Sequence, residues 1–430
     1  MAELRCLAEV RLWDRRVGAL AEMDDGRVVF EYDPTFRRSG LEISPLHLPL
    51  SVGSPLTFDE LRRKPAFNGL PGVLADSLPD SFGNLVIRAY YAARGQTELA
   101  MSPVQRLLYV GRRAIGALTY HPEEPLPPRP AEQESLDVSA LVRDARKVIE
   151  GRPDVAIPEI YRIGSSAGGM RPKVLVLYGR ETGRIRSGYA EPQPGDVPCV
   201  LKFDGVGDAV HRDELLAPAP FNRVEAAYAH MARDAGVQTA EVDILESPGG
   251  YAHLLIRRFD IDQAGDRLHQ HTLGGLLHVD YNDVGASSYE EYLRTALRLG
   301  LPPAEIEQAY RRMVFNVVAV NQDDHVKNLS FHMTKEGTWR LTPAYDVTFA
   351  KGGGFTSQHQ MRIADKRAGI TRADLLGVGR AFGVKRAARI LDEAIGVVAR
   401  CREYAAETGV PEATRRDIAS ELEQRRKEIG

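Results

Sequence analysis

An aspartate and an asparagine stand at a spacing that suits phosphoryl transfer. Residues 317–320 read Val-Val-Ala-Val, and polar groups follow this apolar run at once: Asn321, Asp323, Asp324, His325, Lys327 and Asn328. Four residues separate Asp323 from Asn328, which is the D-x-x-x-x-N spacing of the catalytic aspartate and the metal-binding asparagine in protein kinases. We interpret the segment as the tip of a buried element that carries polar groups to a site, with Asp323 as the catalytic residue.

Two other interpretations of this segment stay open. A polar turn that ends a helix would also explain adjacent aspartates. Asp324 is the rival catalytic residue, but its spacing to Asn328 is one residue short of the kinase pattern, which favours Asp323. His325 could ligate a metal, but a single histidine between polar neighbours is more often structural, so we expect it to orient the loop through hydrogen bonds.

Asp346 follows Asn328 by eighteen residues, in the sequence LTPAYDVT. The residues between them predict a hairpin of strands 329–333 and 338–342, turned at residues 335–337. Such a hairpin would fold the chain back so that Asn328 and Asp346 face one point. Carboxylate and amide oxygens suit a hard ion such as Mg²⁺, so the sequence predicts a magnesium site at these two residues.

Lys202 ends the short apolar run PCVLKFD and is a candidate for binding the α- and β-phosphates of ATP. A lysine at the end of such a run is often only a surface residue with a buried stem. The expected partner of Lys202 is Glu225, in the helical segment FNRVEAAYAHMA. Glu225 has an alternative role, because Asn222-x-x-Glu225 also fits a capping box.

The glycine-rich stretch GSSAGGMRPKV, residues 164–174, precedes the Lys202 strand. Glycines allow backbone N–H groups to turn toward an anion, although a plain flexible connector is the alternative. Residues 254–260 could be a hinge that receives adenine, or an ordinary interior strand. The residues assigned to nucleotide binding are Gly164, Ser165, Ser166, Gly168, Gly169, Lys173, Lys202, Glu225, Arg258, Phe259 and His325.

The composition is that of an ordinary globular protein of 430 residues, with 43% hydrophobic and 27% charged residues. A net charge of −3 gives no electrostatic support for a nucleic-acid binder. The three cysteines lie far apart, the first residues lack the apolar core of a signal peptide, and no run of about eighteen apolar residues occurs. We therefore expect a cytoplasmic protein that does not contact membranes.

The pattern along the chain predicts four parts. Residues 1–125 are β-rich, with a hairpin at Asp24-Asp25-Gly26. Residues 126–150 form a proline-rich linker and a helix, residues 151–262 an ATP-binding part like a kinase N-lobe, and residues 263–430 a helical lobe that carries the catalytic loop. The expected fold is α+β and bilobal, protein-kinase-like, with a β-rich N-terminal subdomain and a mostly helical C-terminal lobe.

The ordered motifs GSSAGGMRPK, LKF, RRFD, NQDDHVKN and TPAYDV resemble the HipA family of serine/threonine kinase toxins. FNGLPGVLADSLPDSFGN, residues 67–84, resembles that family's N-terminal subdomain. The resemblance covers most of residues 1–350. It implies that Asp323 is catalytic, that Asn328 and Asp346 hold magnesium, that Lys202 binds ATP, and that Ser165 or Ser166 is autophosphorylated.

The resemblance also implies biological partners. These are a small HipB-like helix-turn-helix antitoxin, operator DNA bound mainly through that antitoxin, and a protein substrate such as glutamyl-tRNA synthetase or another translation component. Three alternatives are a small-molecule kinase on a related scaffold, a non-catalytic module that binds antitoxin and DNA, and a metal-dependent nuclease built on residues 323–325. The intact set of Lys202, Asp323, Asn328 and Asp346 argues against a non-catalytic module, and a nuclease would leave the glycine-rich loop unexplained.

Overall fold

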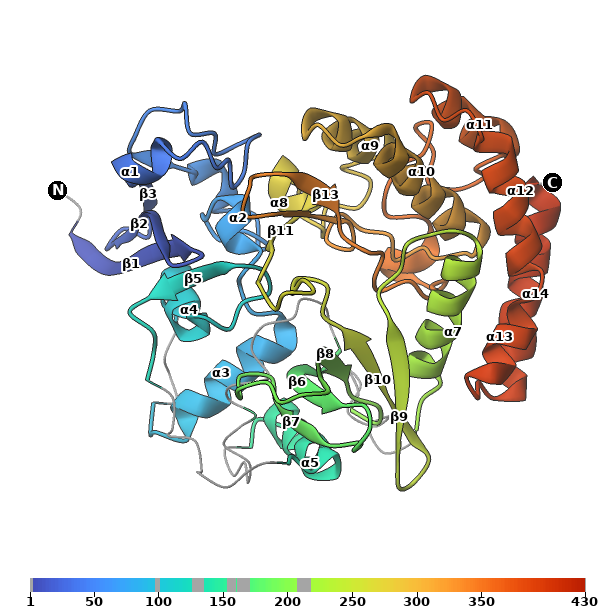
Figure 1. Ribbon diagram of the computed structural model, residues 1–430, viewed down its shortest axis with the longest axis horizontal. Helices are drawn as coiled ribbons and strands as arrows, with labels where there is room; N and C mark the ends of the chain where they lie inside the picture. The colour runs from blue at the N-terminus through green and yellow to red at the C-terminus, as the bar shows by residue number, and fades with distance from the viewer. Residues whose placement is uncertain are drawn as a thin grey trace.

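The structure is a computed structural model that describes residues 3–96, 101–125, 135–152, 160, 171–206 and 218–429. In these ranges the strands form three sheets, and helices dominate the C-terminal part (Figure 1). The first sheet lies on one side of the molecule, and the helices from α9 onward lie on the opposite side (Figure 1). This combination of separate sheets and helices is the predicted α+β class.

The first sheet is antiparallel throughout and has the order β4-β3-β2-β1-β5. Gly26, with a φ of 77°, turns the chain between β2 and β3, so the hairpin predicted there is confirmed. A second tight turn at Trp13 and Asp14, both with positive φ, joins β1 to β2 and was not predicted. The elements of this part are β1 Leu4–Leu12, β2 Arg15–Met23, β3 Val28–Tyr32, α1 Pro34–Arg37, β4 Leu56–Thr57, α2 Gly72–Ala75, α3 Ser81–Ala92, α4 Pro103–Val110 and β5 Leu118–His121.

The second sheet is also antiparallel, in the order β7-β6-β8-β10-β9. Strand β8 ends at Lys202, as the apolar run there indicates, and β10 includes residues 254–257, for which an interior strand was one interpretation. The short β7 and the half-exposed β9 were missed because they lack such an apolar run. The elements are α5 Val138–Ile149, β6 Lys173–Gly179, β7 Ile185–Ser187, β8 Asp196–Lys202, α7 Phe221–Asp234, β9 Val242–Ser247 and β10 Tyr251–Arg257.

The C-terminal part is less helical than the sequence indicates. The predicted hairpin is confirmed as β12 and β13, but β11 joins it as a third strand. Residues 342–371 are largely irregular, because their polar groups bond to neighbouring loops rather than to a helical turn. The elements are β11 His269–Thr272, α8 Leu273–Leu277, α9 Tyr289–Arg298, α10 Pro303–Val318, β12 Ser330–Met333, β13 Trp339–Leu341, α11 Arg372–Ala381, α12 Ala387–Val398, α13 Cys401–Glu407 and α14 Glu412–Ile429.

One hydrophobic core runs from the first sheet into the C-terminal helices. It contains Val10 and Phe30 of the first sheet together with Leu273, Tyr289 and Phe315 of the C-terminal part. A second core joins α3 and α5 to the second sheet. The N-terminal part therefore packs against both other parts of the molecule.

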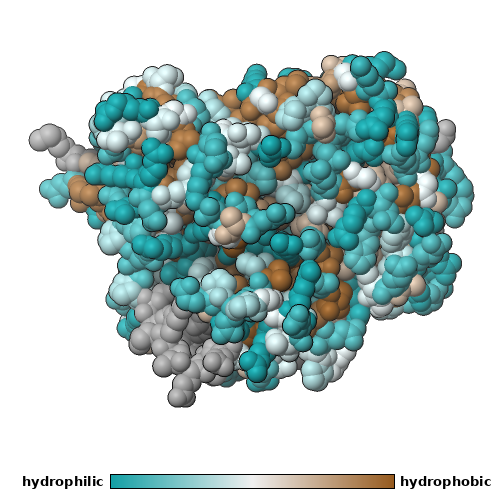
Figure 2. All heavy atoms as spheres, viewed as in Figure 1, coloured by the Kyte–Doolittle hydropathy of each residue, from teal (hydrophilic) through white to brown (hydrophobic). Residues whose placement is uncertain are grey.

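The surface is mainly hydrophilic on the face that Figure 2 shows. Among the described residues, the exposed large hydrophobic side chains are few and scattered: Leu4 and Leu7 of β1, Phe221, Leu297 and Phe355. Such isolated residues are normal for a protein surface. Within the described ranges, no helix is both long enough and apolar enough to cross a membrane.

Candidate active site

The segment after α10 presents Asp323 to the solvent and buries Asp324. Val320, which follows the last turn of α10, has a φ of 53°, a conformation that β-branched residues rarely adopt and that is often found near functional sites. The Asp323 side chain keeps 44% of its surface exposed. Gln360 Nε2 donates a hydrogen bond to one of its oxygens, Oδ1, at 2.6 Å. The other oxygen of Asp323 has no hydrogen-bond partner among the described residues, so it is open to a reacting group.

Asp324 has the opposite environment. Its carboxylate is buried and accepts hydrogen bonds from the Tyr289 hydroxyl at 3.1 Å and the Gln360 backbone N–H at 2.7 Å. His359 Nδ1 lies 2.8 Å from the same carboxylate. These contacts engage both oxygens, so Asp324 anchors the loop, and the geometry favours Asp323 as the residue that could act on a substrate.

Lys202 contacts carboxylates from two different parts of the molecule. Its ammonium group lies 2.6 Å from Glu225 Oε1 and also contacts Asp346 Oδ1. Glu225 is on α7, which packs against the second sheet, whereas Asp346 follows β13 in the C-terminal lobe. Asp346 has a φ of 52°, which is uncommon outside glycine and typical of residues held in place at functional sites.

The capping-box interpretation of Glu225 is wrong. Pro220 precedes the first residue of α7, and no side chain caps this helix end. The Asn222 amide instead donates to the backbone carbonyls of Lys202, at 3.3 Å, and Ala252, at 2.9 Å. Asn222 thus fastens α7 to strands β8 and β10, which leaves Glu225 available for Lys202.

The charges of this cluster stabilise one another. Burial lowers the pKa of Lys202, but the carboxylates of Asp346 and Glu225 outweigh burial and hold that pKa above its ordinary value. Burial raises the pKa of Asp346, but Lys202 and Lys173 outweigh it and hold that pKa below its ordinary value. Lys202 and Asp346 are therefore both ionised at neutral pH.

Lys173 lies beside Lys202 in the second sheet, because the two residues are directly opposite each other on β6 and β8. Its side chain is 4% exposed, and its Nζ atom lies 3.7 Å from Asp80 Oδ2. Burial holds the pKa of Lys173 below its ordinary value, and the carboxylates of Asp80 and Asp346 oppose this effect in part. The site thus holds two neighbouring ammonium groups, which could bind an anionic ligand such as a phosphate chain.

Asn328 and Asp346 can supply two oxygen ligands to a metal. The Asn328 amide nitrogen donates to the Asp323 carbonyl at 2.9 Å, and within the described ranges the amide oxygen has no hydrogen-bond donor. In the part of the chain that the structure describes, no three His, Cys, Asp or Glu residues converge as in a protein-only metal centre. Two oxygen ligands suit Mg²⁺, which usually keeps water and substrate phosphates as its other ligands.

Two of the predicted residues, His325 and Arg258, do not have the expected contacts. His325 Nδ1 is buried without a hydrogen-bond partner among the described residues, and its Nε2 lies 4.0 Å from Asp323 Oδ1, so the predicted orienting hydrogen bond is absent there. Arg258 is buried and binds Asp260 through two hydrogen bonds, and its backbone N–H donates to the Pro198 carbonyl. Arg258 is therefore committed to the protein interior rather than to a ligand.

Phe259 stacks on Tyr345, the residue before Asp346, with 5.4 Å between the ring centroids. The glycine-rich residues Gly164, Ser165, Ser166, Gly168 and Gly169 lie outside the described part of the chain. Sequence reasoning missed Gln360 and Asp80. No spacing rule points to Gln360, whereas Asp80 lies in the motif FNGLPGVLADSLPDSFGN, to which no role in the site was assigned.

Comparisons with known proteins show the family of this chain. The family description "HipA-like C-terminal domain" matches residues 165–402, more than half of the chain, and "HipA N-terminal domain" matches residues 8–121. The predicted kinase Y4mE of Sinorhizobium fredii is 25% identical over 418 residues, covering 91% of this chain and 91% of that protein. The predicted kinase Y4dM of the same organism is 23% identical over 353 residues, covering 79% and 76%.

A solved structure shares the fold over the whole length. HipA of Shewanella oneidensis MR-1, solved with HipB and its operator DNA, has a TM-score of 0.67 at 19% identity and covers 98% of this chain and 97% of its own. This likeness confirms the predicted kinase-like α+β fold.

Proposed function

Because this chain belongs to the HipA family, we propose that it is an ATP-dependent protein serine/threonine kinase that acts as a growth-inhibiting toxin. The observation that carries the proposal is the convergence at one point of Lys202, Glu225 and Asp346 from two lobes. Phosphoryl transfer requires mainly positioning and charge stabilisation, and this cluster beside Asp323 and Asn328 supplies the groups for both.

The residues have distinct roles in this proposal. Asp323 orients the acceptor hydroxyl and accepts its proton through the oxygen that Gln360 leaves free. Lys202, held by Glu225, binds the ATP phosphates. Mg²⁺ held by Asn328 and Asp346 would neutralise phosphate charge. Phe259 borders the nucleotide site beside Tyr345.

We propose a small HipB-like helix-turn-helix antitoxin as the partner. The Shewanella HipA was solved with HipB and operator DNA, which supports this choice. Since this chain has a net charge of −3, contact with operator DNA is expected mainly through the antitoxin. The proposed substrate is a protein of the translation machinery, such as an aminoacyl-tRNA synthetase.

We also propose that Ser165 or Ser166 is phosphorylated by the enzyme itself. A phosphoserine carries about −1.5 to −2 charges at neutral pH and would repel the ATP phosphates. Mass spectrometry of the unmodified protein and of Asp323→Ala checks this proposal. Phosphate on this loop in the unmodified protein alone supports self-modification, and none in either protein contradicts it.

The main test is label transfer from γ-labelled ATP to proteins of a cell lysate. Asp323→Ala should lower the transfer rate roughly 10²- to 10⁴-fold, because the loss of a general base acts on the reaction step. Calorimetry should show unchanged ATP affinity for this variant, since Asp323 acts mainly in the transition state.

Asp324→Asn is the matched control. It should lower the free energy of unfolding by roughly 1–3 kcal/mol, because it disturbs a buried hydrogen-bonded carboxylate. Label transfer that survives in Asp323→Ala but not in folded Asp324→Asn would shift the catalytic assignment by one residue. Label found only on a small molecule would indicate a small-molecule kinase instead.

A further inference from the structure

Residues 64–80, here called the junction segment, connect the N-terminal sheet to the C-terminal lobe. Lys64 Nζ donates to the carbonyl of His278 at 2.8 Å, and the Gly72 N–H donates to His278 Nε2 at 3.0 Å. A Cβ atom at Gly72 would lie 2.0 Å from the carbonyl oxygen of Gly275. Only glycine at position 72 therefore allows α2 to lie directly against α8.

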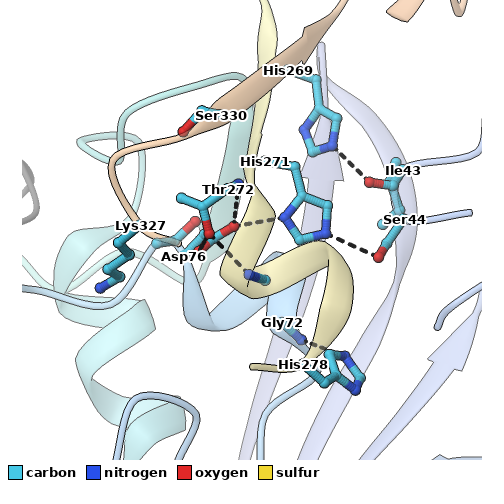
Figure 3. A network of polar contacts seen from close by, with 12 residues as sticks. Ile43, Ser44, Gly72, Asp76, His269, His271, Thr272, His278, Lys327 and Ser330 are labelled. Atoms are coloured by element: carbon cyan, nitrogen blue, oxygen red, sulfur yellow. Dashed lines mark hydrogen bonds and ion pairs between the residues drawn. The ribbon is translucent and has the colours of Figure 1, made fainter. Parts of the chain in front are cut away.

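Asp76 fixes the middle of the junction segment to β11 and α8 (Figure 3). Its carboxylate lies 2.6 Å from His271 Nδ1 and accepts hydrogen bonds from the N–H and hydroxyl of Thr272, at 2.8 and 2.7 Å. On its other side, the His271 ring lies 3.0 Å from the Ser44 hydroxyl. Because His271 and Ser44 are fully buried, this chain of bonds positions the two parts against each other rather than acting on a ligand.

Asp80 carries the same segment to the second sheet. It caps α3 by accepting a hydrogen bond from the Gly83 N–H at 2.6 Å, and its other oxygen lies 3.7 Å from Lys173 Nζ. The Asp80 and Lys173 side chains are 5% and 4% exposed. Asp76 and Asp80 thus attach one short segment to two parts of the molecule. Asp76 binds the C-terminal lobe, and Asp80 lies against Lys173 of the second sheet.

The positive charges of Lys173 and Lys202 explain why a carboxylate is needed beside Lys173. Lys173 and Lys202 are opposite each other on adjacent strands, so their ammonium groups repel. Lys202 has Glu225 and Asp346 as direct partners. Among the groups that favour the charged form of Lys173, Asp80 is the strongest, and it comes from the N-terminal part of the chain.

We propose that Asp80 is a positioning residue that holds the Lys173 ammonium for the nucleotide phosphates, so that the N-terminal part of the chain completes the phosphate-binding site. This inference rests on the proposed ATP-dependent activity. It assigns to the motif FNGLPGVLADSLPDSFGN a direct effect on phosphate binding in addition to its packing role.

The test compares the affinities for Mg·ATP and for adenosine in Asp80→Asn, measured by calorimetry. Asparagine caps a helix about as well as aspartate, so this change removes the charge and retains the cap. ATP affinity should fall roughly tenfold or more, as expected for the loss of a charged interaction, and adenosine affinity should not change. Asp137→Asn, which alters the N-cap of α5 in the same way, should leave both affinities unchanged.

A double-mutant cycle shows whether Asp80 acts through Lys173. In a Lys173→Met background, Asp80→Asn should cause no further loss of ATP affinity. Two results would overturn the inference. One is that Asp80→Asn lowers ATP and adenosine affinity equally. The other is that Asp80→Asn lowers ATP affinity equally in the unmodified and the Lys173→Met backgrounds. If Asp80→Asn does not fold, Asp80→Ser replaces it, because serine also caps a helix and carries no charge. A wild-type ratio of the two affinities in that variant overturns the inference.

The outcome also separates this inference from the proposed function. If the unmodified protein binds no ATP, the proposed function fails, and the inference fails with it. If the unmodified protein binds ATP and transfers phosphate, but Asp80→Asn keeps the wild-type ratio of affinities, only the inference fails.

Discussion

Asp323 and Asp324 are adjacent in one loop, but their different surroundings suit them to different roles. Asp324 faces inward, where Tyr289, His359 and the backbone of Gln360 surround its carboxylate. Asp323 faces outward with one oxygen held. A buried, fully bonded carboxylate is suited to hold a loop, whereas a partly exposed one can exchange a proton with a substrate.

Removal of either proposed metal ligand should weaken the magnesium-dependent binding of the nucleotide. Asn328→Ala and Asp346→Ala each remove an oxygen that would hold the ion between protein and phosphates. Calorimetry of ATP binding with and without Mg²⁺ checks this prediction. Equal ATP affinity of the unmodified protein in both conditions would contradict the assignment of these two residues.

At the scale of elements, the irregular segment after Asp346 is held against the catalytic loop. The Gln322 N–H donates to the Ala350 carbonyl at 2.9 Å, and the Ala350 N–H donates to the Val320 carbonyl at 3.1 Å. Gln360 adds a side-chain bond to Asp323 and a backbone bond to Asp324. Because these bonds replace those of a helix or sheet, the segment can be irregular and still position Asp323.

Gln360→Leu should lower the rate of phosphoryl transfer roughly tenfold while leaving the KM for ATP unchanged. The change removes the hydrogen bond that orients Asp323, and a misplaced catalytic group slows the reaction step rather than nucleotide binding. Steady-state kinetics with a labelled protein substrate measures both quantities. Gln358→Leu, at an exposed position on the same segment, is the control. A rise in KM with an unchanged rate would show that Gln360 serves the nucleotide instead.

At the scale of the whole molecule, buried histidines lie where the N-terminal part meets the C-terminal lobe. His269 Nε2 lies 2.8 Å from the Ile43 carbonyl, and its Nδ1 is buried without a partner among the described residues. Burial, followed by repulsion from His271, lowers the pKa of His269 from 6.5 to about 4. A protonated His269 is therefore unfavourable at this junction.

The folded protein should lose stability in acid partly through His269. Since its pKa is depressed on folding, the contribution is complete above about pH 6.5 and is lost as the pH falls toward about 4. His269→Gln retains a donor for the Ile43 carbonyl and cannot be protonated. Between pH 7 and about pH 4.5, the unmodified protein should lose about 2 kcal/mol more free energy of unfolding than this variant. Urea unfolding at both pH values measures the difference, and parallel losses in the two proteins would contradict the prediction.

The sequence by itself determined the α+β class, the hairpin of β12 and β13, the Lys202–Glu225 pair, and the spacing of Asp323, Asn328 and Asp346. These features depend on local patterns or on short, ordered motifs, which are read directly along the chain.

Only the tertiary structure decided which polar groups meet across the molecule. Asp80 and Lys173 are distant in sequence, as are Asp323 and Gln360, and no periodicity links either pair. The same limit applies to Arg258, because only the folded structure shows that its side chain is buried and bonded to Asp260. The environment of a side chain depends on its burial and on contacts between distant segments, and these are fixed only by the folded structure.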